Sequence, residues 1–396
     1  MFASLAAIML LAAALEVEVR PTDGPPVAGT LVELTEARVA LDTSSGRAEI
    51  PFDRLLAITP KQKPKVAERP PGAWLELADG SLVVAADYSV QQRKGMLTLL
   101  DGQQLELSPR DVAHLRLQPL SPAVANEWAR ITAMEVDSDV LVVRKEDRLD
   151  YHKGIVKDVN DKTVDFEVDG EVIPVKRARV FGVVYYRAAG RQLPAASAVV
   201  VDGSGSRWSA VSVSFSDHLR LTTPLGLKLS LPPQWISQLD FSGGKVIYLS
   251  DLQPESVKFT PLFATDKPFP ALEKFFAPRA DRNFDGDPLR IAGQEFTKGL
   301  CIHSRTEVIY RLPGKFSRLK AVAGIDSAVR PRGDVQLVIR ADDRVLLDKT
   351  FTGRDQPEPI DLDITGARRL VILVDFGPDG SFECDHLDLG DARVIK

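Results

Sequence analysis

Cysteine, basic charge in excess and long apolar runs are all missing or scarce in this sequence. Two cysteines among 396 residues exclude a disulfide-dense scaffold and a cysteine-rich zinc site. The 50 Lys and Arg residues do not outnumber the 55 Asp and Glu residues, which argues against a nucleic-acid binder. Outside the first residues, no apolar stretch approaches the ~20 residues that a membrane-spanning helix needs, so we expect no transmembrane segment in the mature chain.

What is present is typical of a globular chain with several domains. Hydrophobic residues make up 44% and charged residues 27%, which excludes wholesale disorder. Residues 1–15 carry no charged side chain, and residues 12–14 are three alanines. This pattern predicts a signal peptide over residues 1–14 and an exported protein, in the periplasm, at the cell surface or outside the cell. The alternative is a buried first strand or helix.

Alternating apolar and polar residues dominate the chain and predict short β-strands. Asp79-Gly80, Asp101-Gly102 and Asp169-Gly170 lie between such runs, as tight hairpin turns do. One segment, residues 121–136, has the spacing of an amphipathic helix, with Ser121 and Pro122 at its start.

The first 250 residues repeat a pattern of turn, strand and closing strand. Counted from Ile50, Leu107, Ile173 and Leu231, the repeats are 57, 66 and 58 residues apart. A period of this size indicates an array of similar modules, for which we expect small SH3-like or Sm-like barrels. The predicted domains are β modules at 16–60, 72–120, 121–188 (with the leading helix) and 195–250, followed by a domain at 256–396.

The last third of the chain has strand patterns suited to an antiparallel β-sandwich. Four segments there resemble successive motifs of the NPCBM/NEW2 family: 298–312, 316–326, 361–367 and 385–394. The resemblance implies a carbohydrate-binding module with a jelly-roll, galactose-binding-like sandwich. The fold class is therefore all-β. Leu389 stands where the family motif carries Trp. If that Trp contacts sugar in the family, this chain lacks the ring on which the sugar stacks; if the Trp is buried, Leu is a tolerable replacement.

Five polar residues in or near these motifs are candidate carbohydrate-binding residues. They are His303, Asp326, Arg340, Asp385 and His386. His303 and Ser304 are adjacent on a strand and point to opposite faces, so they cannot form a nucleophile–base pair. Bracing of loops by Asp326 and Asp385 is the alternative.

The loop 281–287 alternates oxygen donors in the way that a calcium site requires. Asp281 and Asp285 are candidate ligands for a structural Ca²⁺, and analogy with related sandwiches adds Asp391. A solvated acidic turn is the alternative. Cys301 and Cys384 can form a disulfide or remain two free thiols, since sequence spacing does not give the distance between them.

These features favour an exported, non-catalytic protein that binds a glycan through its C-terminal sandwich, and the family resemblance points to a glycan containing galactose. The alternative is a structural or assembly protein of the cell envelope, whose β modules contact other envelope proteins and whose sugar site is vestigial. An enzyme is disfavoured, because the small β modules offer no barrel large enough for a glycosidase site.

Overall fold

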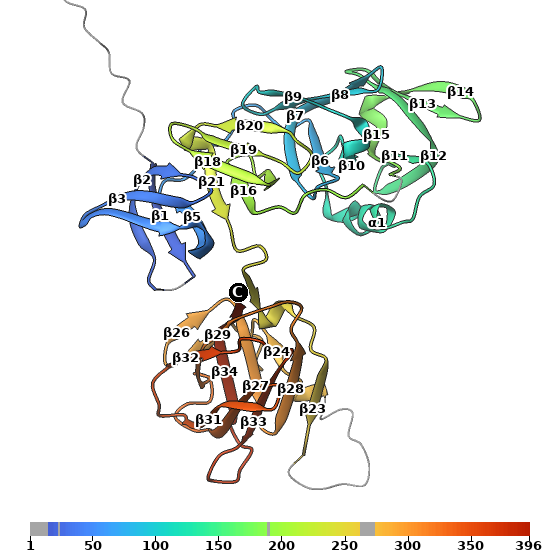
Figure 1. The fold of residues 1–396 in the computed structure, drawn as a ribbon. Coiled ribbons are helices and arrows are strands. Elements are labelled where there is room, and N and C mark those ends of the chain that lie inside the picture. Colours follow the sequence, from blue (N-terminus) through green and yellow to red (C-terminus); the bar gives the residue numbers. More distant parts are fainter. Residues whose placement is uncertain (1–14, 23, 188–190, 262–273) are drawn as a thin grey trace, which may run out of the picture. The chain divides into compact units, whose positions relative to one another are not determined.

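The computed structural model describes residues 15–22, 24–187, 191–261 and 274–396 (Figure 1). The predicted signal peptide at residues 1–14 lies outside the described residues. The all-β prediction is confirmed: among the elements with described bounds nearly every one is a strand, beside a single α-helix of 11 residues and several single 3-10 turns. The chain divides into an N-terminal unit that ends at Gly243 and a C-terminal unit, Gly244–Lys396. No helix in the described part is both long and apolar enough to cross a membrane.

The N-terminal unit contains four copies of one five-strand arrangement, which we number repeats 1 to 4. Repeat 1 has β1 (Leu15–Pro21), β2 (Val27–Leu34), β3 (Arg38–Thr43), β4 (Gly46–Pro51), η1 (Phe52–Arg54) and β5 (Leu55–Pro60). Repeat 2 has β6 (Ala73–Leu77), β7 (Leu82–Gln91), β8 (Lys94–Leu99), β9 (Gln104–Leu107), η2 (Pro109–Asp111) and β10 (Val112–Arg116).

Repeat 3 is preceded by the helix, and repeat 4 has its second strand in two pieces. Repeat 3 has α1 (Pro122–Thr132), β11 (Asp139–Lys145), β12 (Arg148–Val159), β13 (Thr163–Val168), β14 (Glu171–Lys176), η3 (Arg177–Arg179) and β15 (Val180–Val184). Repeat 4 has β16 (Ala198–Asp202), β17 (Arg207–Ala210), β18 (Ser212–Phe215), β19 (Leu219–Thr222), β20 (Lys228–Leu231), η4 (Pro233–Trp235) and β21 (Ile236–Asp240).

In every repeat a 3-10 turn precedes the last strand, and that strand pairs antiparallel with the first. The four 3-10 turns begin at residues 52, 109, 177 and 233, so the repeats are 57, 68 and 56 residues apart. The third sequence anchor, Ile173, is therefore wrong by two residues: Val175 is the equivalent position. A shift of two positions keeps the same face of a strand, which is why alternation alone did not detect it. Ile173 is exposed, whereas Val175 packs against the core.

The four repeats are not separate domains, because strands of different repeats pair with each other. The last strands of repeats 1 and 4 pair with each other, as Leu239 opposite Ile58 shows. The last strands of repeats 2 and 3 pair in the same way, with Leu115 opposite Val183. One apolar core runs through all four repeats, from Leu15 to Phe241. The four repeats are therefore joined by strand pairing and share one core.

The helix is shorter than the sequence predicted. It ends at Thr132 instead of residue 136, and its buried side chains are Val124 and Ile131. These side chains pack with Phe181 and neighbouring strand residues in a small separate core. Met134 follows the helix in a loop.

The C-terminal unit begins before residue 256, the predicted start. β22 (Val246–Tyr248) pairs with the last strand of the chain, and Leu249 lies in the core of the unit. The remaining elements are η5 (Leu249–Asp251), β23 (Ser256–Phe259), β24 (Arg279–Ala280), β25 (Leu289–Ile291), β26 (Gln294–Phe296), β27 (Gly299–His303), β28 (Thr306–Arg311), β29 (Arg318–Ile325), β30 (Asp334–Ala341), β31 (Arg344–Thr352), β32 (Glu358–Asp363), β33 (Arg369–Phe376) and β34 (His386–Ile395).

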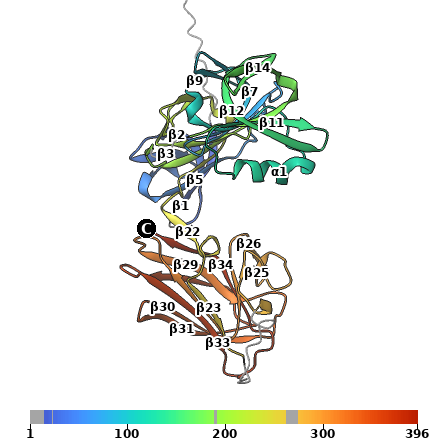
Figure 2. The same cartoon turned by 90° about the vertical axis from the view of Figure 1, so that its right-hand side faces the viewer.

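Two antiparallel sheets form a sandwich in this unit (Figure 2). One sheet has the order β24-β27-β34-β29-β32, with β22 also paired to β34. The other has the order β23-β28-β33-β30-β31. Alternate residues of both sheets, such as Val308, Leu337 and Leu387, fill the space between them. This alternation is the one expected of sandwich strands that bury one face.

Candidate functional site

Two histidines far apart in the sequence meet at one end of the C-terminal sandwich. His303 is the last residue of β27 and His386 is the first residue of β34, and the register of these strands places the two opposite each other. Their ring centroids are 5.5 Å apart. The central strand pairing therefore brings these two predicted site residues together.

Two phenylalanines complete the group, which we call the His/Phe cluster: Phe276, Phe284, His303 and His386. The Phe276 ring lies 4.2 Å from the His303 ring, and the Phe284 ring lies 4.8 Å from the His386 ring, between centroids. The Arg279 guanidinium lies over the Phe284 ring at 5.7 Å. Sequence reasoning missed Phe276, Phe284 and Arg279, because no motif marks them. The one available signal was the pair of adjacent aromatic residues at 275–276.

The two histidines differ in accessibility. His303 is only 3% exposed, and burial lowers its pKa to about 4, so its imidazole is neutral at neutral pH. Its Nδ1 contacts the Ser304 carbonyl oxygen and so carries the hydrogen. His386 is half-buried, and burial lowers its pKa although the charge of Asp326 opposes that change. His386, Phe276 and Phe284 keep partial exposure, so a ligand can reach them while His303 supports them from within.

Asp326 braces a loop instead of facing solvent. It is 1% exposed and follows β29 directly. Its Oδ1 accepts hydrogen bonds from the Ala328 amide at 2.8 Å and from Asn283 Nδ2 at 3.4 Å. Its own amide donates to the His386 carbonyl oxygen at 2.9 Å. Asp326 thus holds the loops on both sides of the cluster together.

A second carboxyl group, Asp388, lies against Asp326 in the interior. Burial, and then the neighbouring Asp326, raise the pKa of Asp388 to about 9. Asp388 therefore holds a proton at neutral pH, because two buried carboxyl groups this close cannot both be charged. Cys301 lies beside the pair, and burial raises the pKa of its thiol well above the ordinary value.

Asp385 also braces the backbone. It is completely buried; its Oδ2 accepts a hydrogen bond from Ser304 Oγ at 2.5 Å, and its Oδ1 accepts one from the Asp334 amide at 3.2 Å. Burial raises the pKa of Asp385 to about 6. The contacts of Asp326 and Asp385 are those of side chains that brace loops, the alternative to sugar binding considered for these two residues.

Arg340 lies elsewhere. Its guanidinium pairs with Glu307 at 2.9 Å on the outer face of the other sheet. β30 starts at Asp334, which contacts Asp385, and Arg340 is six positions further along this strand. At ~3.3 Å per residue, it is roughly 20 Å from the cluster end. The structure therefore does not place Arg340 near the other four candidate carbohydrate-binding residues.

The three carboxylates proposed for calcium are not gathered either. Asp281 accepts hydrogen bonds from Lys298 Nζ at 2.9 Å and the Gly299 amide at 3.0 Å, and Asp391 pairs with Arg393. Within the described residues, no three His, Cys, Asp or Glu side chains lie close enough together to hold a metal. Lys298 and Arg393 are thus ionic partners of Asp281 and Asp391, and calcium binding by Asp281, Asp285 and Asp391 stays a prediction.

Cys301 and Cys384 are free thiols in this structure, so the disulfide alternative is not realised there. Leu389 is 1% exposed and belongs to the sandwich core. In this chain the position of the family's Trp is therefore a packing position, and its change to Leu removes no exposed sugar platform.

Comparison with known proteins follows the same division of the chain. Residues 245–395 match the family model described as the NPCBM/NEW2 domain. No curated protein matches the chain. Among solved structures, a CBM51 module of a Clostridium perfringens GH95 protein, in complex with methyl-galactose, is 21% identical, with a TM-score of 0.33. That match covers 38% of this chain and 99% of the other.

Two further solved structures that match also contain CBM51 modules. The CBM51-2 and INT domains of Clostridium perfringens ZmpB are 19% identical, with a TM-score of 0.33, over 47% of this chain and 37% of that one. Tandem CBM51 modules of a Streptococcus pneumoniae family 98 glycoside hydrolase are 13% identical, with a TM-score of 0.31, over 81% of this chain and 87% of the other. The family match places residues 245–395 of this chain in the NPCBM/NEW2 domain family.

Proposed function

We propose that the C-terminal unit binds a glycan on the exposed side of the His/Phe cluster. The observation that carries this proposal is the gathering of aromatic rings with polar groups beside them. Phe284 and His386 keep partial exposure and offer ring surface for the C–H face of a sugar, whereas Phe276 packs against Phe259 at 5.0 Å and His303 at 4.2 Å and supports the group. His386 packs against the Phe284 ring and the Arg279 guanidinium lies over that ring, so both can exchange hydrogen bonds with the hydroxyl groups of a sugar bound beside it.

The proposed role is binding without catalysis. Glycoside hydrolysis requires two carboxyl groups that reach the scissile bond from either side. At this end of the sandwich Asp326, Asp385 and Asp388 are each no more than 1% exposed and are held by backbone or carboxyl partners. A bound sugar cannot reach them without unfolding the loops that they brace.

The test measures glycan affinity of the full chain by isothermal titration. Galactosides are the first ligands, because the resemblance in sequence is to modules related to galactose binding. Phe284→Ala and His386→Ala should weaken binding about 5-fold or more, since each removes a contact of roughly 1 kcal/mol or more. Arg340→Ala is the matched control and should bind as the unchanged protein does.

His303→Ala and Asp326→Ala should act through stability instead, because both side chains are buried. Thermal melts separate this effect from a loss of contact. Unchanged affinity in Phe284→Ala, or no binding to any galactoside or acidic polysaccharide, would overturn the proposal. A stable protein partner without any sugar-induced thermal shift would select the envelope-assembly alternative.

The apolar run at residues 1–15 supports a related proposal, that the protein is exported and meets its glycan outside the cytoplasm. Cell fractionation tests this: the full chain should leave the cytoplasm, and a chain lacking residues 1–14 should stay there. Equal export of both chains would contradict it.

A further inference from the structure

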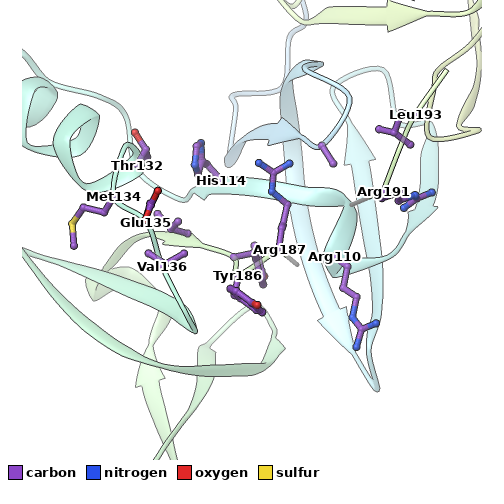
Figure 3. A pocket seen from close by; sticks show the side chains of 13 residues that line it. Arg110, His114, Thr132, Met134, Glu135, Val136, Tyr186, Arg187, Arg191 and Leu193 are labelled. Carbon is purple, nitrogen blue, oxygen red and sulfur yellow. The ribbon is translucent and has the colours of Figure 1, made fainter. Parts of the chain in front are cut away.

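A cavity of about 1010 Å³ lies in the N-terminal unit between repeats 2 and 3 (Figure 3). β10 contributes His114 to its wall, η2 contributes Arg110, and the loop after α1 contributes Glu135. The segment that follows β15 contributes Tyr186 and Arg187. None of these residues belongs to the C-terminal unit.

The walls of this cavity are fixed by backbone contacts. β10 pairs with β6 on one side and with β15 on the other, so hydrogen bonds along both of its edges hold it in place. The chain leaving β15 is anchored where the Tyr185 amide donates to the Ala113 carbonyl oxygen at 3.0 Å. The next amide, of Tyr186, donates to Asp139 Oδ1 at 2.8 Å. The cavity is therefore built into the fold of the unit and does not depend on a partner to form.

Basic side chains dominate the lining. Arg110, Arg187, Arg191 and His114 line the cavity, against the single carboxylate of Glu135. Arg191 pairs with Asp111 and His114 with Glu76, so the unpaired basic groups of the lining are Arg110 and Arg187, which form no ion pair with any described residue. The chain as a whole has a net charge of −5, so this local excess of positive charge runs against its composition. Unpaired arginines in a concave site favour an anionic ligand.

The opposite wall has a different chemistry. In Figure 3, Thr132, Met134 and Glu135 lie on one side, Arg110, Arg191 and Leu193 lie on the other, and Tyr186 and Arg187 lie between them. Thr132 and Glu135 can exchange hydrogen bonds with hydroxyl groups. The Tyr186 ring is 46% exposed and offers a flat apolar surface between the two sides.

We propose that this cavity binds an anionic oligosaccharide. Arg110 and Arg187 would receive its carboxylate or sulfate groups, Glu135 and Thr132 its hydroxyl groups, and Tyr186 one face of a sugar ring. The volume lies at the upper end of the range for ligand sites, ~300–1000 Å³, and suits a short oligosaccharide. An extended acidic peptide fits less well: it would add to a free strand edge, and β10 and β15 are each paired on both sides.

The experiment titrates the full chain with trigalacturonate, a sulfated chondroitin disaccharide, neutral galactotriose and a pentaglutamate peptide, at low and at physiological salt. Uronate and sulfate ligands test the two sources of negative charge. Arg110→Gln and Arg187→Gln should each weaken binding of the acidic sugar about 10-fold or more, because each removes a charge-assisted hydrogen bond. Both side chains are exposed, so thermal stability should not change.

Arg20→Gln, an exposed arginine on β1, is the matched control and should leave affinity unchanged. Binding should weaken as salt rises, since the contacts are ionic and open to solvent. The proposal fails if no acidic sugar binds at low salt, if both arginine variants bind as the unchanged protein does, or if only the peptide binds. Phe284→Ala should not alter this binding, so failure here and failure of the C-terminal glycan site can be told apart.

Discussion

The two units of this protein use β-strands in opposite ways. The N-terminal unit repeats one five-strand pattern four times and keeps nearly all its acidic and basic side chains near its surface: among Asp, Glu, Lys, Arg and His, only Asp111 and Asp202 are less than a tenth exposed in its described part. The C-terminal unit is smaller, yet it buries His303, Asp326, Asp385 and Asp388. Burying such groups costs free energy unless they have partners, and a sandwich does not need them to fold. The buried polar side chains of the C-terminal unit therefore hold its loops in place, and their burial lowers the free energy of unfolding of that unit.

The largest expected effect tests whether the C-terminal unit is independent and where it starts. Residues 244–396 expressed alone should fold, because the sandwich has its own core. Residues 256–396 lack β22 and the fully buried Leu249, and should be less stable by about 3–5 kcal/mol. Chemical denaturation of both fragments measures the difference. Equal stability would mean that β22 is not part of the unit.

Two glycines allow each unit to be perturbed alone. A Cβ at Gly390 would lie 2.5 Å from the Phe296 ring, and a Cβ at Gly182 would lie 2.4 Å from the Leu115 carbonyl oxygen. Gly390→Ala should therefore destabilise only the C-terminal unit, and Gly182→Ala only the N-terminal unit, each by about 1–3 kcal/mol.

Two-transition calorimetry of the full chain separates these effects. Gly243→Ala is the control, because its Cβ would contact nothing. If either substitution lowered both transitions equally, the two units would not unfold independently.

The buried carboxyl pair gives a smaller, pH-dependent effect. Asp388 keeps its proton in the folded protein up to about pH 9, whereas an unfolded Asp releases it near pH 4. Unfolding thus releases a proton between these values, and the stability of the C-terminal unit falls as pH rises through this window. Asp388→Asn has no proton to lose. It should be more stable than the unchanged protein at pH 8, by about 1 kcal/mol or more, and close to it at pH 4.

Urea denaturation at the two pH values checks this prediction. Asp111→Asn, in the N-terminal unit, serves as a comparison that should leave the C-terminal transition unchanged at both. A stability difference for Asp388→Asn that does not depend on pH would show that the pair does not hold a proton.

The sequence by itself determined the class of fold, the existence of the repeats and the family of the last third. Strand alternation and turn dipeptides are local properties, and four ordered motifs are long enough to identify a family without coordinates. The same local character explains the two-residue error at Ile173, since strand periodicity repeats every second position.

Only the tertiary structure decided which candidate residues share a site. His303 and His386 are 83 positions apart in the chain, and the register of β27 with β34 places them opposite each other. Phe284 contacts His386 from a loop. Arg340 belongs to the same unit but lies on the outer face of the other sheet. The pairing of strands and the direction of each side chain set these distances. Both depend on contacts between segments distant in sequence, which residue types and local spacing do not contain.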